Sequence, residues 1–349
     1  MFSADAYEVA SSDIPWNLLS GRRILVTGAS GFLGGHLIRC LLSLHRLGKV
    51  SAPIHVVAMV REKIKARERL FDLVDDPNIE IMQWDLNQID IPKIGPCHYI
   101  FHVASQASPR FFDSDPVGTI LPNTLGTAAL LEAQKQQCRK PQGFLFVSSS
   151  EVYGIPKGNA PISETDYGVL DSASVRSCYA ESKRLGESLC IAWNHQHNIP
   201  TFIARPFHTY GPGLLQVDGR VFADFAFNVL RGENIAMKSD GTARRAFCYV
   251  SDAISGLFTV LLKGKPATPY NVANPEAELS VMELAELLVG LYPEKKIQIE
   301  STVGIDRSKY ITSSCECFIP DINRISDLGW APQVMPATGF RRMIEAYEA

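Results

Sequence analysis

Residues 22–34 read Arg-Arg-Ile-Leu-Val-Thr-Gly-Ala-Ser-Gly-Phe-Leu-Gly, and this stretch decides the fold. Its first part is a short, mostly apolar run with β-branched residues, which predicts a buried strand. Gly28, Gly31 and Gly34 follow, and apolar residues then recur at helical spacing as far as about His45. A strand, a glycine-rich turn and a helix in this order predict a βαβ unit whose helix N-terminus binds a dinucleotide pyrophosphate.

Strand and helix patterns keep alternating through about residue 206. Further strands are predicted at residues 54–60, 80–84, 99–103, 143–148 and 200–205, and helices at about 123–135 and 178–195. Most strand residues are apolar, which is typical of a parallel sheet covered by helices on both faces. The expected fold class is therefore α/β, with a Rossmann-type doubly wound parallel sheet.

The pattern loosens in the second half, where glycine and proline become frequent. Two helices, at about 253–262 and 281–291, and a short strand at 269–273 are still predicted there. We expect a smaller C-terminal substrate-binding lobe, with some segments returning to the sheet. The expected domains are an NAD(P)-binding Rossmann domain of residues 18–206 plus about 249–275, and a substrate lobe of residues 207–248 plus 276–349.

The composition is that of an ordinary globular protein. The chain has 349 residues, with 34 Lys and Arg against 37 Asp and Glu, and a formal net charge of −3. This balance argues against nucleic acid or an anionic membrane surface as a partner. No apolar run is long enough to span a bilayer, and the N-terminus lacks a secretory pattern, so a cytoplasmic location is expected.

The cysteines predict neither disulfides nor a metal centre. All eight are scattered along the chain, as expected for reduced thiols that pack like small apolar residues. Cys315 and Cys317 are close together, but no second Cys/His pair occurs at zinc spacing, so no metal site is expected.

The residues after the second strand bear on the choice between NAD and NADP. Many NAD-binding proteins carry an acid there that binds the adenosine ribose, whereas this chain has Val60-Arg61, with no acid before Glu62. Arg61 fits a ribose 2′-phosphate, which favours NADP, or it is a solvated surface arginine. Asp85, just past the third strand, either reaches the adenine or is an ordinary turn acid. Both cofactors stay open at this point.

Tyr179 and Lys183 stand four residues apart in Tyr-Ala-Glu-Ser-Lys and share one face of the predicted helix. A free tyrosine has a pKa of about 10 and is a poor base at neutral pH. A neighbouring ammonium group and a positive nicotinamide ring stabilise the phenolate and lower that pKa. Downstream of a dinucleotide turn, the pair predicts a tyrosine base, with Lys183 also bonded to the nicotinamide ribose.

Ser149 and Glu151 lie within residues 148–154, at the carboxyl end of the fifth predicted strand. Open parallel sheets form their ligand crevices at such ends. The Ser149 hydroxyl is placed to share a proton with Tyr179 and a substrate. Glu151 adds a carboxylate, which oxidation of a hydroxyl does not require. A carboxylate at this place suits proton transfer at a carbon next to a newly formed ketone. The alternative is a turn that carries a surface acid.

Further motifs support a family resemblance from about residue 20 to 345. They are Asn123-Thr-Leu-Gly-Thr127, Arg205-Pro-Phe-His-Thr-Tyr-Gly-Pro212, Arg245-Ala-Phe-Cys-Tyr-Val-Ser-Asp252 and Leu328-Gly-Trp-Ala-Pro332. With them the chain resembles the extended short-chain dehydrogenases/reductases of the NAD-dependent sugar epimerase/dehydratase family. Within that family it is most similar to the UDP-glucuronate decarboxylases (UDP-xylose synthases), which share Asp218-Gly-Arg220-Val and a loop like Ala104-Ser-Gln-Ala-Ser-Pro109.

The resemblance implies that NAD⁺ oxidises the C4 hydroxyl of a nucleotide sugar, with Tyr179 as base and Ser149 as proton partner. The 4-keto sugar then loses its C6 carboxylate as CO₂, and NADH returns the hydride. Arg245 is expected to bind the diphosphate or the carboxylate, or else to be a structural arginine paired with an acid. A homodimer that pairs through the helix carrying Tyr179 and the helix near residues 123–135 is also implied.

The implied site residues fall into three groups. The catalytic residues are Ser149, Glu151, Tyr179 and Lys183. The cofactor-binding residues are Gly28, Ser30, Gly31, Phe32, Leu33, Arg61, Asp85, Leu86, Val103, Ala104, Ser105, Asn123, Tyr179, Lys183, Pro206 and Phe207. The substrate-binding residues are Ser108, Ser150, Glu151, His208, Arg220 and Arg245.

Some positions depart from the decarboxylase pattern and keep other reactions open. Gln106 stands where those enzymes have proline, and His208 where the family usually has asparagine. The Ser-Glu pair also resembles GDP-mannose 4,6-dehydratases, which use NADP and in which the glutamate removes a C5 proton before water leaves. The alternatives are thus a 4,6-dehydratase, then a 4-epimerase, and, in a different class, a non-catalytic dinucleotide-binding regulator. The intact proton-transfer set argues against the regulator.

Overall fold

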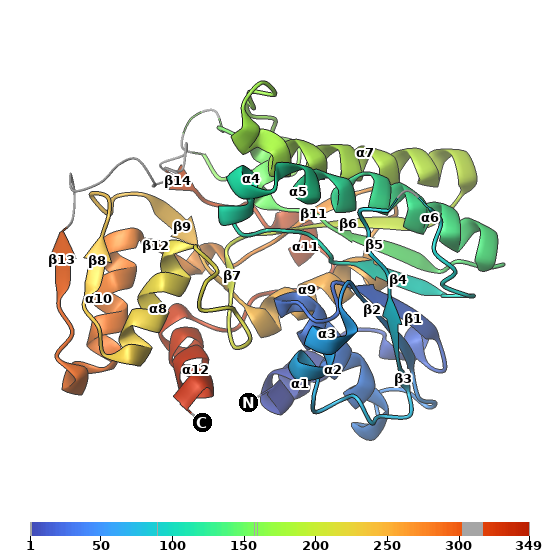
Figure 1. Cartoon of the computed structure of the whole chain (residues 1–349), viewed down its shortest axis with the longest axis horizontal. Coiled ribbons are helices and arrows are strands. Elements are labelled where there is room, and N and C mark those ends of the chain that lie inside the picture. Colours follow the sequence, from blue (N-terminus) through green and yellow to red (C-terminus); the bar gives the residue numbers. More distant parts are fainter. Residues whose placement is uncertain (1, 89, 157, 159, 302–316, 349) are drawn as a thin grey trace.

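A seven-stranded parallel sheet forms the centre of the computed structural model, which describes residues 2–88, 90–156, 158, 160–301 and 317–348 (Figure 1). Its order is β11-β6-β5-β4-β1-β2-β3, and every neighbouring pair is parallel. The strands are β1 (Arg23–Thr27), β2 (His55–Val60), β3 (Ile79–Gln83), β4 (Tyr99–His102), β5 (Gly143–Val147), β6 (Thr201–Pro206) and β11 (Pro269–Val272). The predicted doubly wound sheet is confirmed, and its order reverses between β1 and β4, where ligands bind in such sheets.

Helices cover both faces of the sheet because alternate strand residues are apolar on both sides. Ile24 and Val26 pack into one apolar cluster, whereas Leu25 packs into the other. On the first face lie α1 (Phe2–Ser11), α2 (Phe32–Arg46), α3 (Lys63–Arg69) and α9 (Val250–Lys263) (Figure 1). On the second face lie α4 (Arg110–Ser114), α5 (Pro116–Asn123), α6 (Leu125–Gln137) and α7 (Cys178–His197). The predicted helix at 123–135 begins later because a separate helix, α5, ends at Asn123.

A smaller group of elements lies beside the central sheet (Figure 1). Its strands are β7 (Thr209–Tyr210), β8 (Ile235–Met237), β9 (Arg244–Ala246), β10 (Cys248–Tyr249), β12 (Glu278–Ser280), β13 (Ile299–Ser301) and β14 (Cys317–Phe318). Its helices are α8 (Val221–Arg231), α10 (Val281–Leu291) and α12 (Pro336–Glu348), whereas α11 (Asn323–Ser326) lies against β11 and α9 of the central part (Figure 1). Short 3₁₀ helices are η1 (Trp16–Leu19), η2 (Ser150–Tyr153), η3 (Val175–Ser177), η4 (Pro275–Ala277) and η5 (Pro293–Lys295). None of the described helices combines the length and apolarity that a membrane span requires.

Helix α1, which the sequence did not predict, joins the central sheet to the smaller group. It packs against α2 and α9. The buried Asp5 carboxylate accepts a hydrogen bond from the Tyr249 hydroxyl at 3.1 Å. Glu8 accepts from the Ser251 hydroxyl at 3.0 Å and pairs with Arg342 of α12 at 2.8 Å. Burial raises the pKa of Asp5 to about 6, although the Tyr249 bond opposes this shift.

Replacing Asp5 by Asn tests this buried carboxyl. A carboxyl whose pKa is higher in the folded than in the unfolded state stabilises the fold at low pH, and this contribution is lost as the pH rises through about 6. Asn does not titrate, so we expect the stability of Asp5→Asn relative to wild type to increase by about 1–3 kcal/mol between about pH 4 and 6. Urea unfolding across that range measures the change. Asp13→Asn, at an exposed carboxylate, is the control, and a flat difference for Asp5→Asn would contradict the account.

Candidate active site

The glycine turn between β1 and α2 brings backbone segments very close together. Gly28 has a φ of +62°, and a Cβ there would lie 2.8 Å from Cα of Ala104. A Cβ at Gly34 would lie 2.2 Å from the Gly28 carbonyl oxygen, so the turn accepts only glycine at both positions. A hollow lined in part by Ser30 and Arg69 lies at the start of α2. The turn and the helix start therefore fit a dinucleotide pyrophosphate.

A buried threonine–histidine contact, which the motifs did not predict, fixes the strand ends next to this turn. The Thr27 hydroxyl lies 2.8 Å from Nδ1 of His102. The same hydroxyl accepts from the backbone N–H groups of Val103 and Ala104, both at 3.0 Å. Burial lowers the pKa of His102 to about 3, so its ring is neutral. The signal in the sequence is a lone histidine at the end of an apolar strand.

Helix α7 places Tyr179 and Lys183 side by side, with only 6% and 2% of their surfaces exposed. Nζ of Lys183 donates to the Val147 carbonyl at 2.7 Å and lies 5.7 Å from the centroid of the Tyr179 ring. Burial lowers the pKa of Lys183 to about 7, and the negative charge of Glu187 opposes this shift. The structure thus brings the predicted pair together at the end of β5.

The surroundings of Tyr179 combine burial with charges of both signs. Burial raises the pKa of its hydroxyl to about 12, and a hydrogen bond with Ser149 opposes the shift. Glu151 raises the pKa further, whereas Arg220 and Arg176 lower it. Tyr179 therefore stays protonated at neutral pH until further positive charge, such as an oxidised nicotinamide ring, lies beside it.

Ser149 and Glu151 stand at the start of η2, directly after β5. The Ser149 hydroxyl accepts from the backbone N–H of Glu151 at 3.2 Å and caps this 3₁₀ helix. The Glu151 carboxylate lies 3.2 Å from the Arg176 guanidinium. Arg176 was not among the predicted residues, although it precedes Tyr179 by only three positions.

A buried polar network lies behind these residues and was also missed. The Ser148 hydroxyl donates to Glu187 at 2.5 Å, and Arg205 donates to both Glu187 carboxylate oxygens at 2.8 and 2.6 Å. A further N–H of Arg205 donates to the Tyr153 hydroxyl at 2.9 Å, and Tyr153 donates to Asn271 at 2.5 Å. The network joins α7 to the ends of β5 and β6, to η2 and to β11.

We expect Glu187→Gln to lower the free energy of unfolding by about 3–5 kcal/mol, because it leaves the buried Arg205 charge without its partner. The two side chains are only 9% and 7% exposed. Urea denaturation measures the loss. Glu233→Gln in the exposed Arg231–Glu233 pair is the matched control, with an expected change of about 1 kcal/mol or less. Equal losses in the two variants would contradict the assignment.

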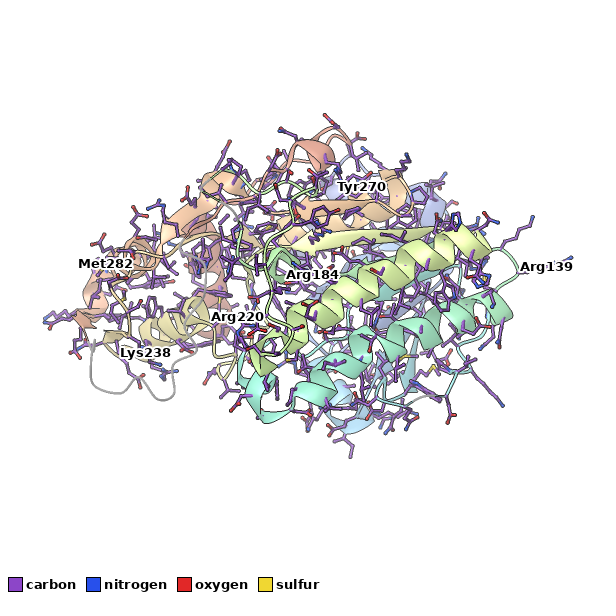
Figure 2. All side chains as sticks on the ribbon, turned by 90° about the horizontal axis from the view of Figure 1, so that it is seen from above. Arg139, Arg184, Arg220, Lys238, Tyr270 and Met282 are labelled. Atoms are coloured by element: carbon purple, nitrogen blue, oxygen red, sulfur yellow. The ribbon has the colours of Figure 1, made fainter. Side chains whose placement is uncertain are left out.

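Two arginines and a histidine gather on the substrate side of the site. Arg220 donates to both carboxylate oxygens of Asp218 at 2.5 and 2.9 Å, and Figure 2 shows it beside the N-terminal end of α7. Arg245 is buried and donates to the Arg244 carbonyl at 2.6 Å. Burial, reinforced by the two arginines, lowers the pKa of His208 to about 3. Its Nδ1 is buried without a hydrogen-bond partner among the described residues, so this cluster can hold an anionic group.

The substrate-side loop between β4 and α4 is tied down at two points. The Gln106 amide donates to Asp115 at 2.9 Å, and Asp115 caps α5. The Ser108 hydroxyl donates to the Asp218 carbonyl and so links this loop to the segment that carries Arg220. The glutamine in place of proline therefore has a defined structural partner.

Other residues predicted to bind the cofactor or the substrate lie outside these networks. The Arg61 side chain is 58% exposed, and Asp85 accepts from the backbone N–H of Asn87 at 3.0 Å. The buried Asn123 donates to the Ser182 hydroxyl at 3.0 Å and so joins α5 to α7. Leu33, Leu86, Ser105, Ser150, Pro206 and Phe207 are buried or half-buried. Their contacts with a cofactor or substrate stay predictions.

The part of the chain that the structure describes contains no group of three His, Cys, Asp or Glu residues able to hold a metal ion. Six cysteines in that part are buried and free. Cys315 and the side chain of Cys317 lie outside it.

Comparison with known proteins identifies the family. Residues 24–273 match the model of the NAD dependent epimerase/dehydratase family, and the chain belongs to it. UDP-glucuronic acid decarboxylase 6 of Arabidopsis thaliana is 35% identical over 94% of this chain and 89% of its own length. UDP-glucuronic acid decarboxylase 1 of Xenopus tropicalis is 33% identical over 93% of this chain and 72% of its own length. The family resemblance expected from the sequence is confirmed.

Solved structures confirm the fold. UDP-glucose 4-epimerase of Thermotoga maritima has a TM-score of 0.78 at 22% identity, covering 93% of this chain and 98% of its own. UDP-glucuronic acid 4-epimerase of Bacillus cereus, solved with UDP-glucuronic acid and NAD, has a TM-score of 0.77 at 24% identity. It covers 93% of this chain and 99% of its own.

Proposed function

We propose that this protein is a nucleotide-sugar lyase that removes CO₂ from UDP-glucuronate after transient oxidation at C4. The observation that carries the proposal is the meeting of Tyr179, Lys183, Ser149 and Glu151 at the end of β5, beside the glycine turn. The curated relatives support decarboxylation, because they are UDP-glucuronic acid decarboxylases matched over more than nine-tenths of this chain.

In this proposal the chain transfers protons at two atoms, the C4 hydroxyl oxygen and C5. Tyr179 takes the proton of the C4 hydroxyl, with Ser149 as its partner, while Lys183 stabilises the phenolate. NAD, when bound, supplies the hydride acceptor and later the hydride donor at C4. With a ketone at C4, the C5–C6 bond breaks, its electron pair moves into an enolate, and CO₂ leaves. Glu151 then assists the transfer of a proton to C5 of this enolate.

We propose NAD rather than NADP as the cofactor. The NAD dependence in the family's description supports this choice. The Arg61 side chain also lies 3.9 Å from Glu62, whose carboxylate would repel a ribose 2′-phosphate. The glycine turn would hold the pyrophosphate, and Lys183 the nicotinamide ribose.

We propose that His208, Arg220 and Arg245 bind the diphosphate of the nucleotide sugar. The two guanidinium groups support this assignment, as does the buried Nδ1 of His208, for which the described part of the chain offers no hydrogen-bond partner. The substrate would then lie between a Rossmann domain of residues 18–206 plus about 249–275 and a lobe of residues 207–248 plus 276–349.

A 4,6-dehydratase is the second candidate, because Glu151 also suits removal of a C5 proton. That role requires a carboxylate free to reach C5. Decarboxylation also needs Glu151 to act at C5, so the order of the two candidates follows the curated relatives, which are UDP-glucuronic acid decarboxylases.

Product analysis separates these candidates. The purified protein is incubated with NAD⁺ or NADP⁺ and UDP-glucuronate, UDP-glucose, dTDP-glucose or GDP-mannose, and the products are weighed by mass spectrometry. We expect loss of CO₂ from UDP-glucuronate with NAD⁺. Loss of water from a neutral hexose would instead assign a dehydratase.

Tyr179→Phe should abolish turnover and keep cofactor binding, because it removes only the hydroxyl that transfers the proton. Isothermal titration with NAD⁺ and product analysis measure the two properties. Tyr7→Phe, at an exposed tyrosine on α1, is the control. Turnover within about twofold of wild type in Tyr179→Phe would exclude the tyrosine as base.

We propose a homodimer that pairs through α5, α6 and α7. Apolar side chains on these helices are exposed and would be covered in such a dimer. They include Val117, Ile120, Leu125, Leu185 and Ile191, which are 36–62% exposed. We also propose a cytoplasmic location, which the six free buried cysteines support because such thiols stay reduced there.

Charge placed on this surface should dissociate the dimer. We expect Leu125→Glu/Leu185→Glu to be a monomer by size-exclusion chromatography with light scattering, because two buried charges per subunit oppose the interface. Ile64→Glu, at an exposed residue on the opposite face of the sheet, is the control and should stay dimeric. A monomeric wild type would contradict the proposal.

A further inference from the structure

Arg176 contacts the site from η3, the short helix immediately before α7. Its guanidinium Nη2 lies 3.2 Å from Oε2 and 3.5 Å from Oε1 of Glu151. Both side chains are partly exposed, at 35% and 42%, so the pair contributes little to stability. The pair therefore acts mainly on the position and the charge of the Glu151 carboxylate.

The same guanidinium also contacts the aromatic stack that contains Tyr179. It lies 4.8 Å from the centroid of the Phe112 ring, a distance at which cation–π attraction operates. The Phe112 and Tyr179 rings stack with their centroids 5.0 Å apart and their planes at 17°. The Cys178 thiol completes this cluster and donates to the Phe112 carbonyl at 3.8 Å.

We propose that Arg176 is a positioning residue of this site, which holds the Glu151 carboxylate and the Phe112–Tyr179 stack in one arrangement. This inference rests on the proposed function, in which Tyr179 takes the proton of the C4 hydroxyl and Glu151 assists proton transfer to C5. Neither the motifs nor the comparisons assign a role to Arg176.

The charges around Tyr179 show why the arrangement matters for catalysis. Glu151 faces it from η2, Arg176 from η3, and Arg220 from the segment before α8, while Lys183 lies on its own helix. The Glu151 carboxylate raises the pKa of Tyr179, and the two arginines lower it. Without Arg176, the Glu151 charge is less well offset, and Tyr179 loses its proton at a higher pH.

The first test is the pH dependence of hydride transfer, followed at 340 nm in single turnovers with NAD⁺ and UDP-glucuronate. We expect Arg176→Met to move the acidic limb of the profile upward by about one pH unit. The rate at neutral pH should fall by about tenfold. Arg176→Lys should reverse part of this pH shift, because lysine restores the positive charge but not the planar guanidinium group.

A double variant isolates the coupling. Adding Glu151→Gln to Arg176→Met removes both charges. The acidic limb of the pH profile should then return toward its wild-type position, although the rate of hydride transfer stays low. Arg139→Met, at an exposed arginine far from the site in Figure 2, should leave the profile unchanged. A wild-type profile in Arg176→Met, or a shift that Glu151→Gln does not reverse, would overturn the proposal.

The second test does not depend on turnover. Cys178 shares a buried cluster with Phe112 and Tyr179, so loosening the stack should expose its thiol. We expect Arg176→Met to speed alkylation of Cys178 by iodoacetamide by roughly threefold or more, with Cys40 unchanged as a check on global unfolding. Arg176→Lys should alkylate more slowly than Arg176→Met. An unchanged rate would refute the positioning role, whereas absence of any product from UDP-glucuronate would refute only the proposed function.

Discussion

The ion pair between Glu187 and Arg205 is the interaction on which the site depends. It is almost fully buried, and both oxygens of the carboxylate accept from the guanidinium. Glu187 lies one turn after Lys183 on α7, and Arg205 lies at the end of β6. Bonds to Ser148 and Tyr153 extend the pair to the segment that carries Ser149 and Glu151. Because a buried charge without its partner is strongly unfavourable, these segments have to stay together.

Around this pair, the protein sets proton affinities through burial and nearby charge. Burial lowers the pKa of Lys183 to about 7 and raises that of Tyr179 to about 12. In the free protein, Lys183 is therefore only partly protonated at neutral pH, and the Tyr179 hydroxyl keeps its proton. Catalysis instead needs a charged lysine beside a phenolate. The Arg176–Glu151 pair and Arg220 set the balance around the phenol, and an oxidised nicotinamide would add positive charge beside it. Cofactor binding and activation of the base are thus linked.

Local patterns in the sequence predicted the sheet, the glycine turn and the Tyr179–Lys183 pair. These features depend on spacing within a few residues, so periodicity and turn chemistry reveal them. Two contacts between distant residues were not predicted, because no local pattern marks them: Arg176 meets Glu151 from 25 positions away, and Glu187 meets Arg205 from 18. Helix α1 was missed for a related reason, because a helix of 10 residues is marginal alone and depends on partners such as Tyr249.

The central claim is that C4 of the sugar is oxidised and then reduced again within one turnover. It is tested most directly with UDP-glucuronate that carries deuterium at C4, incubated with the protein, NAD⁺ and ordinary water. The account predicts that the decarboxylated product keeps deuterium at C4 and carries two hydrogens at C5, as nuclear magnetic resonance would show. Product that has lost the deuterium from C4 would contradict a hydride that is removed and returned at the same carbon.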